Sequence, residues 1–426
     1  MEPSEDGPSL KRDLALATWG LFTGLALLLL AAGLFGTLLG VRSELVKLPT
    51  VVSSLISASY YLGFLVGSRV ALRALGRVGH IRVYAALASL LSAAMLTVGL
   101  TESAPAWAWL RFVTGLCLAG QYVVAESWLN DLATNENRGR LLAIYAVVTS
   151  GAFGLGQLLL FRMDARAVTG FAIASIITSL AVAPVALSEE AVAPGVVERE
   201  HISLRDLAKV VPTGVGSCLL VGVAHGALTG MAAIYATRVG LSTGRIGLFV
   251  AAPNIGGMLL HWPVAAASDD LDRRAVGFAA SCTAIGAAVL LLLAPSSSSM
   301  ALLLMAGLGG FSYPLYSIAA AYTNDWIEPE QVNAAASQLV TLYGFGAVMG
   351  PFVAAGMMIV VGAKGYFWAA IILHALLAAF FLYRLLAWRA PLAKRPWGEV
   401  SLPARAFFVP ATVVAMGRRY RSNRGR

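Results

Sequence analysis

Charged residues are scarce in this chain. Only 12% of its 426 residues are Asp, Glu, Lys or Arg, whereas 58% are hydrophobic and the mean hydropathy is +0.76. An ordinary soluble domain carries roughly twice that charged fraction, about 25%. So many apolar side chains cannot all enter a core and still leave a polar surface. The composition therefore excludes an ordinary soluble fold, and lipid is the expected solvent for most of the chain.

Cysteine and histidine are also sparse. The three cysteines exclude a disulfide scaffold, and the five histidines show no metal-ligand spacing. No glycine-rich loop is followed by Lys and Ser or Thr, so the sequence does not indicate ATP as an energy source. The basic residues lie between apolar runs rather than along one folded face, which argues against a nucleic-acid partner. We therefore expect no cofactor and no metal.

Long hydrophobic runs are abundant. A membrane-spanning helix needs about 20 mostly apolar residues. Twelve windows of that kind occur, at 16–40, 48–68, 82–101, 105–130, 139–161, 167–187, 210–237, 243–266, 275–294, 299–323, 333–361 and 365–388. They predict an all-α polytopic membrane protein. The first window is too long for a cleavable signal, so we expect it to be retained as a span.

The distribution of Lys and Arg predicts the orientation. With both termini in the cytoplasm, most of the 31 basic residues fall on the cytoplasmic side. The opposite side then holds only Arg42, Lys47, Arg162, Arg166, Arg238, Arg245 and Lys364. We expect a multi-pass protein of the inner membrane.

The chain divides into two related halves. The longest internal polar stretch, 188–209, separates six windows from six and includes a predicted short surface helix near 203–209. Related segments start at Asn130-Asp131 and at Asn324-Asp325, and their spans end in Gly156-Gln157 and Gly350-Pro351. Such a repeat is typical of transporters built from two bundles. The expected units are a cytoplasmic N-terminus (1–15), a six-helix bundle (16–187), a cytoplasmic linker (188–209), a second bundle (210–388) and a basic cytoplasmic tail (389–426).

Two charged residues lie within the fourth window, where charge is costly and needs a reason. Arg111 and Glu126 are 15 positions apart, which is roughly 22 Å along a helix. They cannot pair directly, but they can line one cavity. Arg111 is interpreted either as an intramembrane cation that binds an anion or tunes an acid, or as a structural donor. Glu126 either carries a proton or substrate, or closes a gate with Arg69, Arg138 or Arg140.

Several short motifs resemble the major facilitator superfamily. RALGRVGHIRVY, with Arg77, Gly79 and Arg82, resembles the signature between spans two and three, although Gly76 replaces its acid. RFVTG, from Arg111, resembles the Arg-x-x-x-Gly pattern of span four. SDDLDRR, at 268–274, is the equivalent loop of the second half. AESWLNDLATNENRGRLLAIY, at 125–145, is similar to a bacterial YcaD-like branch.

The resemblance implies two six-helix bundles that rock about a shared site, and a secondary transporter of a small organic molecule. We expect proton coupling and favour export. The antiporter pattern Gly-x-x-x-Gly-Pro of span five is only half present, since GAFGLGQ lacks the proline. Uptake symport of an organic anion or metabolite and a non-transporting membrane sensor stay open. A polytopic enzyme is disfavoured because the loops are short.

The residues predicted to bind substrate or protons are polar or aromatic and lie within spans: Arg111, Glu126, Tyr122, Gln121, Tyr145, Gln157, His225, Asn254, Tyr313 and Gln338. Prolines are expected to interrupt span eight at Pro253 and Pro263, and span ten at Tyr313-Pro314. A cytoplasmic gate is predicted at Arg77, Arg82, Asp131, Arg138, Asp269 and Arg273. Asp131 and Arg138 are spaced as in the related pattern of sugar porters.

The predicted partners are a small-molecule substrate, protons and membrane lipids. The tail combines a short apolar segment, ARAFFVPATVVAM, with a run of arginines that ends at Arg426. That combination is typical of a segment on an anionic lipid surface. The chain itself is expected to be a monomer.

Overall fold

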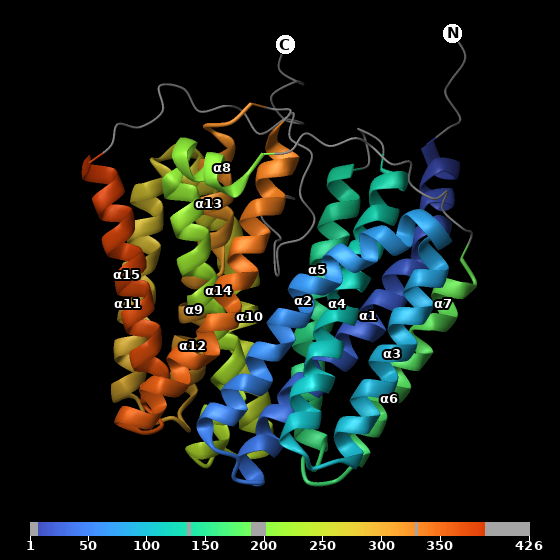
Figure 1. The fold of residues 1–426 in the computed structure, drawn as a ribbon, viewed down its shortest axis with the longest axis horizontal. Helices are drawn as coiled ribbons and strands as arrows, with labels where there is room; N and C mark the ends of the chain where they lie inside the picture. Colours follow the sequence, from blue (N-terminus) through green and yellow to red (C-terminus); the bar gives the residue numbers. More distant parts are fainter. Residues whose placement is uncertain (1–6, 134–137, 189–201, 329–330, 388–426) are drawn as a thin grey trace.

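The computed structural model describes residues 7–133, 138–188, 202–328 and 331–387, and helices make up almost all of this part of the chain (Figure 1). The helices of the first half and the linker are α1 (Gly7–Leu45), α2 (Thr50–Val78), α3 (His80–Leu100), α4 (Ala104–Leu132), α5 (Arg138–Leu158), η1 (Leu159–Arg162), α6 (Thr169–Leu180), α7 (Val182–Ala186) and α8 (Leu204–Val210). Those of the second half are α9 (Pro212–Arg238), α10 (Thr243–Asp270), α11 (Arg273–Leu293), α12 (Ser299–Ser312), α13 (Pro314–Asn324), α14 (Val332–Val361) and α15 (Gly365–Ala387).

Twelve helical segments of the described chain are long and apolar enough to cross a membrane. They coincide with the twelve predicted windows, and α2 extends furthest beyond its window, to Val78. The prediction of an all-α polytopic protein with twelve spans is therefore confirmed. Three spans consist of two consecutive helices each, namely α5 with η1, α6 with α7, and α12 with α13.

The prolines differ in their effect on the helices. Span ten breaks as predicted, because α12 ends at Ser312 and α13 begins at Pro314. The predicted interruption of span eight is wrong, since α10 continues through Pro253 and Pro263. Proline is tolerated inside a spanning helix when its neighbours compensate for the freed carbonyl groups.

The helices form two groups that lie side by side in Figure 1, one from each half of the chain. In the first half α1 packs on α5, α2 on α4, and α3 on α6. In the second half α9 packs on α14, α10 on α12, and α11 on α15. These are equivalent pairs, so the repeat seen in the sequence is also a repeat of helix packing.

The glycines that end the two repeated segments have the same structural role. A Cβ on Gly156 would lie 2.0 Å from the carbonyl oxygen of Leu30 in α1. A Cβ on Gly350 would lie 2.3 Å from the backbone nitrogen of Ala227 in α9. Each glycine therefore lets span five or eleven touch the backbone of the first span of its own half, as small residues do between helices in lipid.

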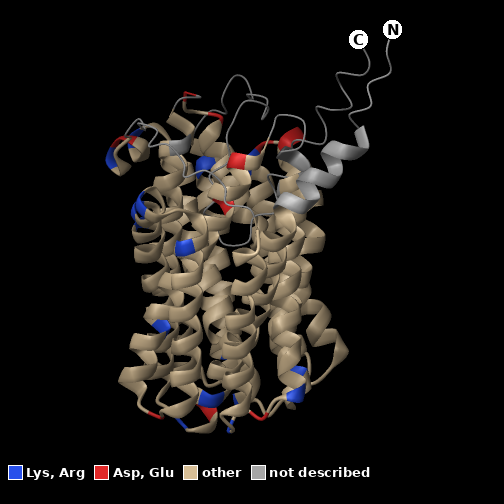
Figure 2. Ribbon diagram, turned by 90° about the vertical axis from the view of Figure 1, so that its right-hand side faces the viewer, with Lys and Arg blue, Asp and Glu red and all other residues tan. Residues whose placement is uncertain are grey.

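The molecule has two ends, and charged residues gather toward them (Figure 2). We call the end that carries α8 and the turn at Gly79 the linker end, and the end that carries the turns at 46–49, 101–103 and 239–242 the distal end. The predicted linker helix is confirmed as α8, which Ser203 caps. The Ser203 hydroxyl also donates to Asp206 and thereby lowers the pKa of that carboxyl. The predicted tail 389–426 and most of the linker lie outside the described residues.

Candidate binding cavity and gates

A cavity lies between the two helix groups, with an empty volume of about 1220 Å³ that includes its opening. Its walls come from α1, α2, α4 and α5 of the first half and from α9, α10 and α14 of the second, together with Tyr313 between α12 and α13. Six of the ten residues predicted to bind substrate or protons line it, namely Arg111, Tyr122, Gln157, His225, Asn254 and Tyr313. The two halves therefore share one pocket, as the repeat predicts.

Arg111 of α4 reaches into this cavity between aromatic rings. Its guanidinium carbon lies 4.5 Å from the ring centre of Tyr60 and 5.5 Å from that of Phe35. Opposite it stands Gly36, where an added Cβ would still be 3.7 Å from the Nη2 atom. The side chain is half-buried, and no hydrogen bond or ion pair joins its guanidinium to another residue of the described chain. The cation is held by ring faces, and its N–H groups keep their hydrogen-bonding capacity.

His225 of α9 is fixed by two hydrogen bonds at the opposite wall. Its Nε2 lies 3.0 Å from the carbonyl oxygen of Ser312, and its Nδ1 lies 3.0 Å from the hydroxyl of Tyr343. A carbonyl can only accept, so Nε2 carries a proton and donates it to Ser312. Ser312 is the last residue of α12, so its carbonyl lies at the break before Pro314. The interrupted helix thus supplies the acceptor that orients His225.

Polar contacts join the two halves near the cavity and toward the distal end. The Asn254 amide of α10 donates to the Gln157 side chain of α5 over 2.9 Å. The Ser57 hydroxyl of α2 donates to the carbonyl of Gly230 in α9, also over 2.9 Å.

An ion pair joins the halves at the distal end itself. The Arg238 side chain of α9 donates to both carboxylate oxygens of Glu44 in α1, at 2.9 and 2.8 Å, and to the Thr50 hydroxyl at 3.1 Å. With the Asn254 and Ser57 bonds, this pair holds the two halves together at the distal end.

Glu126 and Tyr145 form a separate pair behind the cavity wall. The Tyr145 hydroxyl of α5 donates to Glu126 of α4 over 2.9 Å, and Glu126 is only 8% exposed. Neither residue lines the cavity. Tyr122, one helical turn before Glu126, does line it. The carboxyl is therefore close to the cavity but behind its wall.

Two predicted cavity residues face elsewhere. Gln121 is fully buried, and its amide donates to the carbonyl of Tyr84 in α3 over 2.9 Å. The Gln338 amide of α14 donates to the carbonyl of Ile202, just before α8, over 3.1 Å. Neither residue lines the cavity, because a spanning helix also carries polar groups on faces that pack on other helices, and their part in binding stays a prediction.

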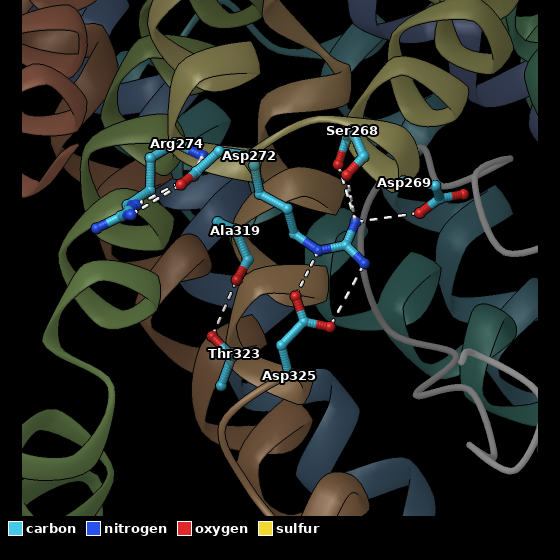
Figure 3. Close-up of polar contacts among 8 residues, drawn as sticks. Ser268, Asp269, Asp272, Arg274, Ala319, Thr323 and Asp325 are labelled. Atoms are coloured by element: carbon cyan, nitrogen blue, oxygen red, sulfur yellow. Dashed lines mark hydrogen bonds and ion pairs between the residues drawn. The ribbon is translucent and has the colours of Figure 1, made fainter. Parts of the chain in front are cut away.

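The linker end holds a buried cluster in the second half (Figure 3). Arg273 of α11 donates to Asp325 over 2.7 Å, and both side chains are 4% exposed. The same guanidinium bonds Asp269 at 3.1 Å and the Ser268 hydroxyl at 2.9 Å. Asp325 fixes the end of α13 to the start of α11. The predicted gate contains Asp269 and Arg273 but not Asp325, which the structure adds to the cluster.

The equivalent cluster of the first half is built differently. Asp131 lies 3.6 Å from Nε2 of His80, the first residue of α3, and that nitrogen is 3.1 Å from the Ser127 hydroxyl. Arg77 and Arg82 are exposed and form no ion pair with a described residue. The Arg138 side chain lies outside what the structure describes. His80 was missed because Gly79-His80 reads as a loop.

Comparison with known proteins agrees with this architecture. The sequence profile of the Major Facilitator Superfamily matches residues 14–305 and 215–421. The chain belongs to the major facilitator superfamily. Over 349 residues it is 32% identical to an uncharacterized MFS-type transporter YcaD of Salmonella arizonae. The matched region covers 79% of this chain and 88% of the relative.

Solved structures of the superfamily share the fold. A variant of the nucleoside transporter NupG superimposes with a TM-score of 0.70 at 11% identity, over 88% of this chain and all of that one. An inward-facing bacterial homologue of the human lysosomal transporter Spinster gives a TM-score of 0.67 at 15% identity, over 88% and 98% of the chains. The protein is thus a multi-pass secondary transporter of small molecules that works by alternating access, and it is not an enzyme.

Proposed function

We propose that this transporter moves a small organic molecule at the expense of a proton gradient, with the substrate in the cavity around Arg111. The observation that carries the proposal is the shared cavity, whose walls come from both halves and whose distal side is held together by contacts between them. In this arrangement, the substrate exchanges at the linker end while the distal end is closed. Rocking of the halves would break the distal contacts and close the linker end instead.

We assign the linker end to the cytoplasm. The positive-inside distribution of Lys and Arg supports this orientation in an inner membrane, with both termini cytoplasmic. The basic tail would then meet the anionic inner leaflet. The single chain contains both halves of the pocket, which supports a monomer as the functional unit.

The pair of Glu126 and Tyr145 is our candidate for the proton site. Glu126 is a buried carboxyl within a span, and the Tyr145 hydroxyl bonds it directly. Buried ionisable groups in spans mark proton relays. Tyr122 lies one helical turn from Glu126 and lines the cavity, so a movement of its ring would connect the proton site to the substrate. If Glu126 did not gain and lose a proton during the transport cycle, the same pair would act only as a gate.

A proteoliposome assay tests this function. Vesicles with and without the protein receive a bacterial metabolite extract under an imposed pH gradient, and mass spectrometry identifies the solutes that accumulate. We expect at least one solute whose accumulation needs both protein and gradient, and Glu126→Gln should abolish the gradient dependence. Glu102→Gln is the matched control, since that carboxylate is 74% exposed at the distal end. Accumulation that ignores the gradient would contradict proton coupling.

The direction of transport stays a prediction, and we favour export. Uptake symport and a sensor are the alternatives. The assay distinguishes them, because export, uptake and absence of flux give different solute distributions for the same gradient.

A further inference from the structure

The formal charge in the lining of the cavity is positive. Among the described residues that line it, Arg111 is the single charged side chain, and no Asp, Glu or Lys is present. Glu126, the acid that the sequence singles out in this span, does not line the cavity and accepts a hydrogen bond from Tyr145. This lining favours an anionic substrate over a cationic one.

The position of the Arg111 guanidinium suits binding of a ligand better than a structural role in helix packing. Its carbon lies over the rings of Tyr60 and Phe35, and its N–H groups form no hydrogen bond with a described residue. Gly36 leaves space beside Nη2. A planar fork of donors matches the two oxygens of a carboxylate or a similar oxyanion. A partly buried cation without a protein counter-charge is costly, so an anionic ligand would relieve that cost.

The remaining walls suit the uncharged body of such a ligand. Tyr61, Tyr122, Phe153, Tyr313 and Tyr343 contribute aromatic surface. The His225 ring also lines the space, with its Nε2 proton donated to a backbone carbonyl. Aromatic rings prefer to pack against planar apolar groups.

We infer that the substrate is an organic monoanion with a planar, ring-containing body, whose anionic group binds Arg111 and whose body packs among these tyrosines. The inference rests on the proposed transport function and names its substrate class. A cationic or zwitterionic amine would meet Arg111 with no carboxylate in the lining to bind its ammonium group.

Binding of matched probes tests the inference. The full chain in lipid nanodiscs is titrated with benzoate, benzamide, benzylammonium and phenyl phosphate, and with the naphthyl members of the same series, by thermal shift and calorimetry. We expect the carboxylates to bind and to raise the melting temperature, and the amides and amines to bind at least tenfold more weakly. Phenyl phosphate tells a carboxylate site from a general oxyanion site.

Variants connect the binding to Arg111. Arg111→Gln should weaken carboxylate binding at least tenfold, and Arg111→Lys should fall between, because it keeps the charge but loses the fork. Arg166→Gln removes an exposed distal charge and should change nothing. If Arg111→Gln does not fold, the carboxylate binding of Arg111→Lys is the test, and binding as tight as in the wild type would overturn the inference. Failure of every carboxylate to bind, or tighter binding of the amines, would overturn the inference.

The outcomes separate this inference from the proposed function. Carboxylate binding without gradient-driven flux refutes proton coupling and leaves the substrate class standing. Gradient-driven flux of an amine, with no carboxylate binding, refutes the substrate class and leaves the transport mechanism standing.

Discussion

The ion pair between Glu44 and Arg238 should set how often the distal end opens. It joins the end of α1 to the end of α9, and therefore one half of the protein to the other. The two side chains are 19% and 25% exposed, and the guanidinium bonds both carboxylate oxygens. Any state in which the distal end opens must break this pair. Glu44→Gln is the smallest change that removes its charge.

The size of the effect follows from the geometry. A hydrogen bond to a charged group contributes about 1.5–3 kcal/mol when it is well shielded, and an exposed ion pair about 0–1 kcal/mol. This pair is partly exposed, and Thr50 still bonds Arg238 after the substitution. We estimate a loss of about 1–1.4 kcal/mol, which corresponds to a five- to tenfold rise in the population open at the distal end.

Thiol labelling measures that population. Ser53 lines the cavity and is 1% exposed, so a thiol introduced by Ser53→Cys reports distal opening. In a background without the three natural cysteines, a membrane-impermeant reagent applied from the distal side should label this position five to ten times faster with Glu44→Gln. Exchanging the two charges, with Glu44→Arg and Arg238→Glu, should restore the original rate.

A matched control lies at the same end. Glu102 pairs with Arg42 at 3.5 Å, but both belong to the first half, so Glu102→Gln should leave the labelling rate unchanged. Equal rates in wild type and Glu44→Gln, or an equal increase with Glu102→Gln, would refute the view that the cross-half pair controls opening.

Two further predictions concern stability and are read as melting temperatures in detergent. Asp325→Asn leaves the buried Arg273 with a weaker set of partners and should cost roughly 3 kcal/mol; an unchanged melting temperature would mean that the cluster does not hold α13 to α11. Gly63→Ala should destabilise by about 1–3 kcal/mol, because its Cβ would lie 1.9 Å from a carbonyl oxygen of α4. Gly151→Ala meets nothing within 4 Å and should be neutral or slightly stabilising, so equal effects of the two would contradict the packing argument.

Much of the fold was readable from the sequence for a physical reason. A spanning helix must form all its backbone hydrogen bonds internally and cover about 30 Å with apolar side chains. The limits of the hydrophobic run therefore predict the limits of the helix. The repeat from Asn130 and Asn324 was readable as well. The break before Pro314 was predicted correctly, whereas Pro253 and Pro263 were not breaks, because packing decides whether a helix tolerates a proline.

Only part of the site could be predicted from the sequence. The position of a residue along its spanning helix gives its depth in the membrane, but it does not give the direction in which the side chain points. Arg111 and Gln121 both lie deep in α4, but one enters the cavity and the other bonds α3. Because α4 carries polar side chains on more than one face, no single polar stripe shows which face meets the partner half. Pairs such as Arg273 with Asp325 depend on contacts between distant helices, which one sequence does not reveal.

Cross-linking the halves tests the central claim that they move about the shared cavity. A Cβ added to Gly230 would lie 3.4 Å from that of Ser57, close to the separation of about 3.5–4.5 Å in disulfides, if the Pro351 ring yields slightly. The pair Ser57→Cys with Gly230→Cys therefore joins the two halves toward the distal end.

The decisive measurement is proteoliposome flux of the accumulated solute before and after oxidation of this double variant. Oxidation should stop the flux, and reduction should restore it. Ser92→Cys with Ser175→Cys is the control, because those hydroxyls lie 2.8 Å apart within the first half, and its oxidation should leave flux intact. Undiminished flux in vesicles whose cross-link between Ser57→Cys and Gly230→Cys is complete would contradict transport by relative movement of the halves.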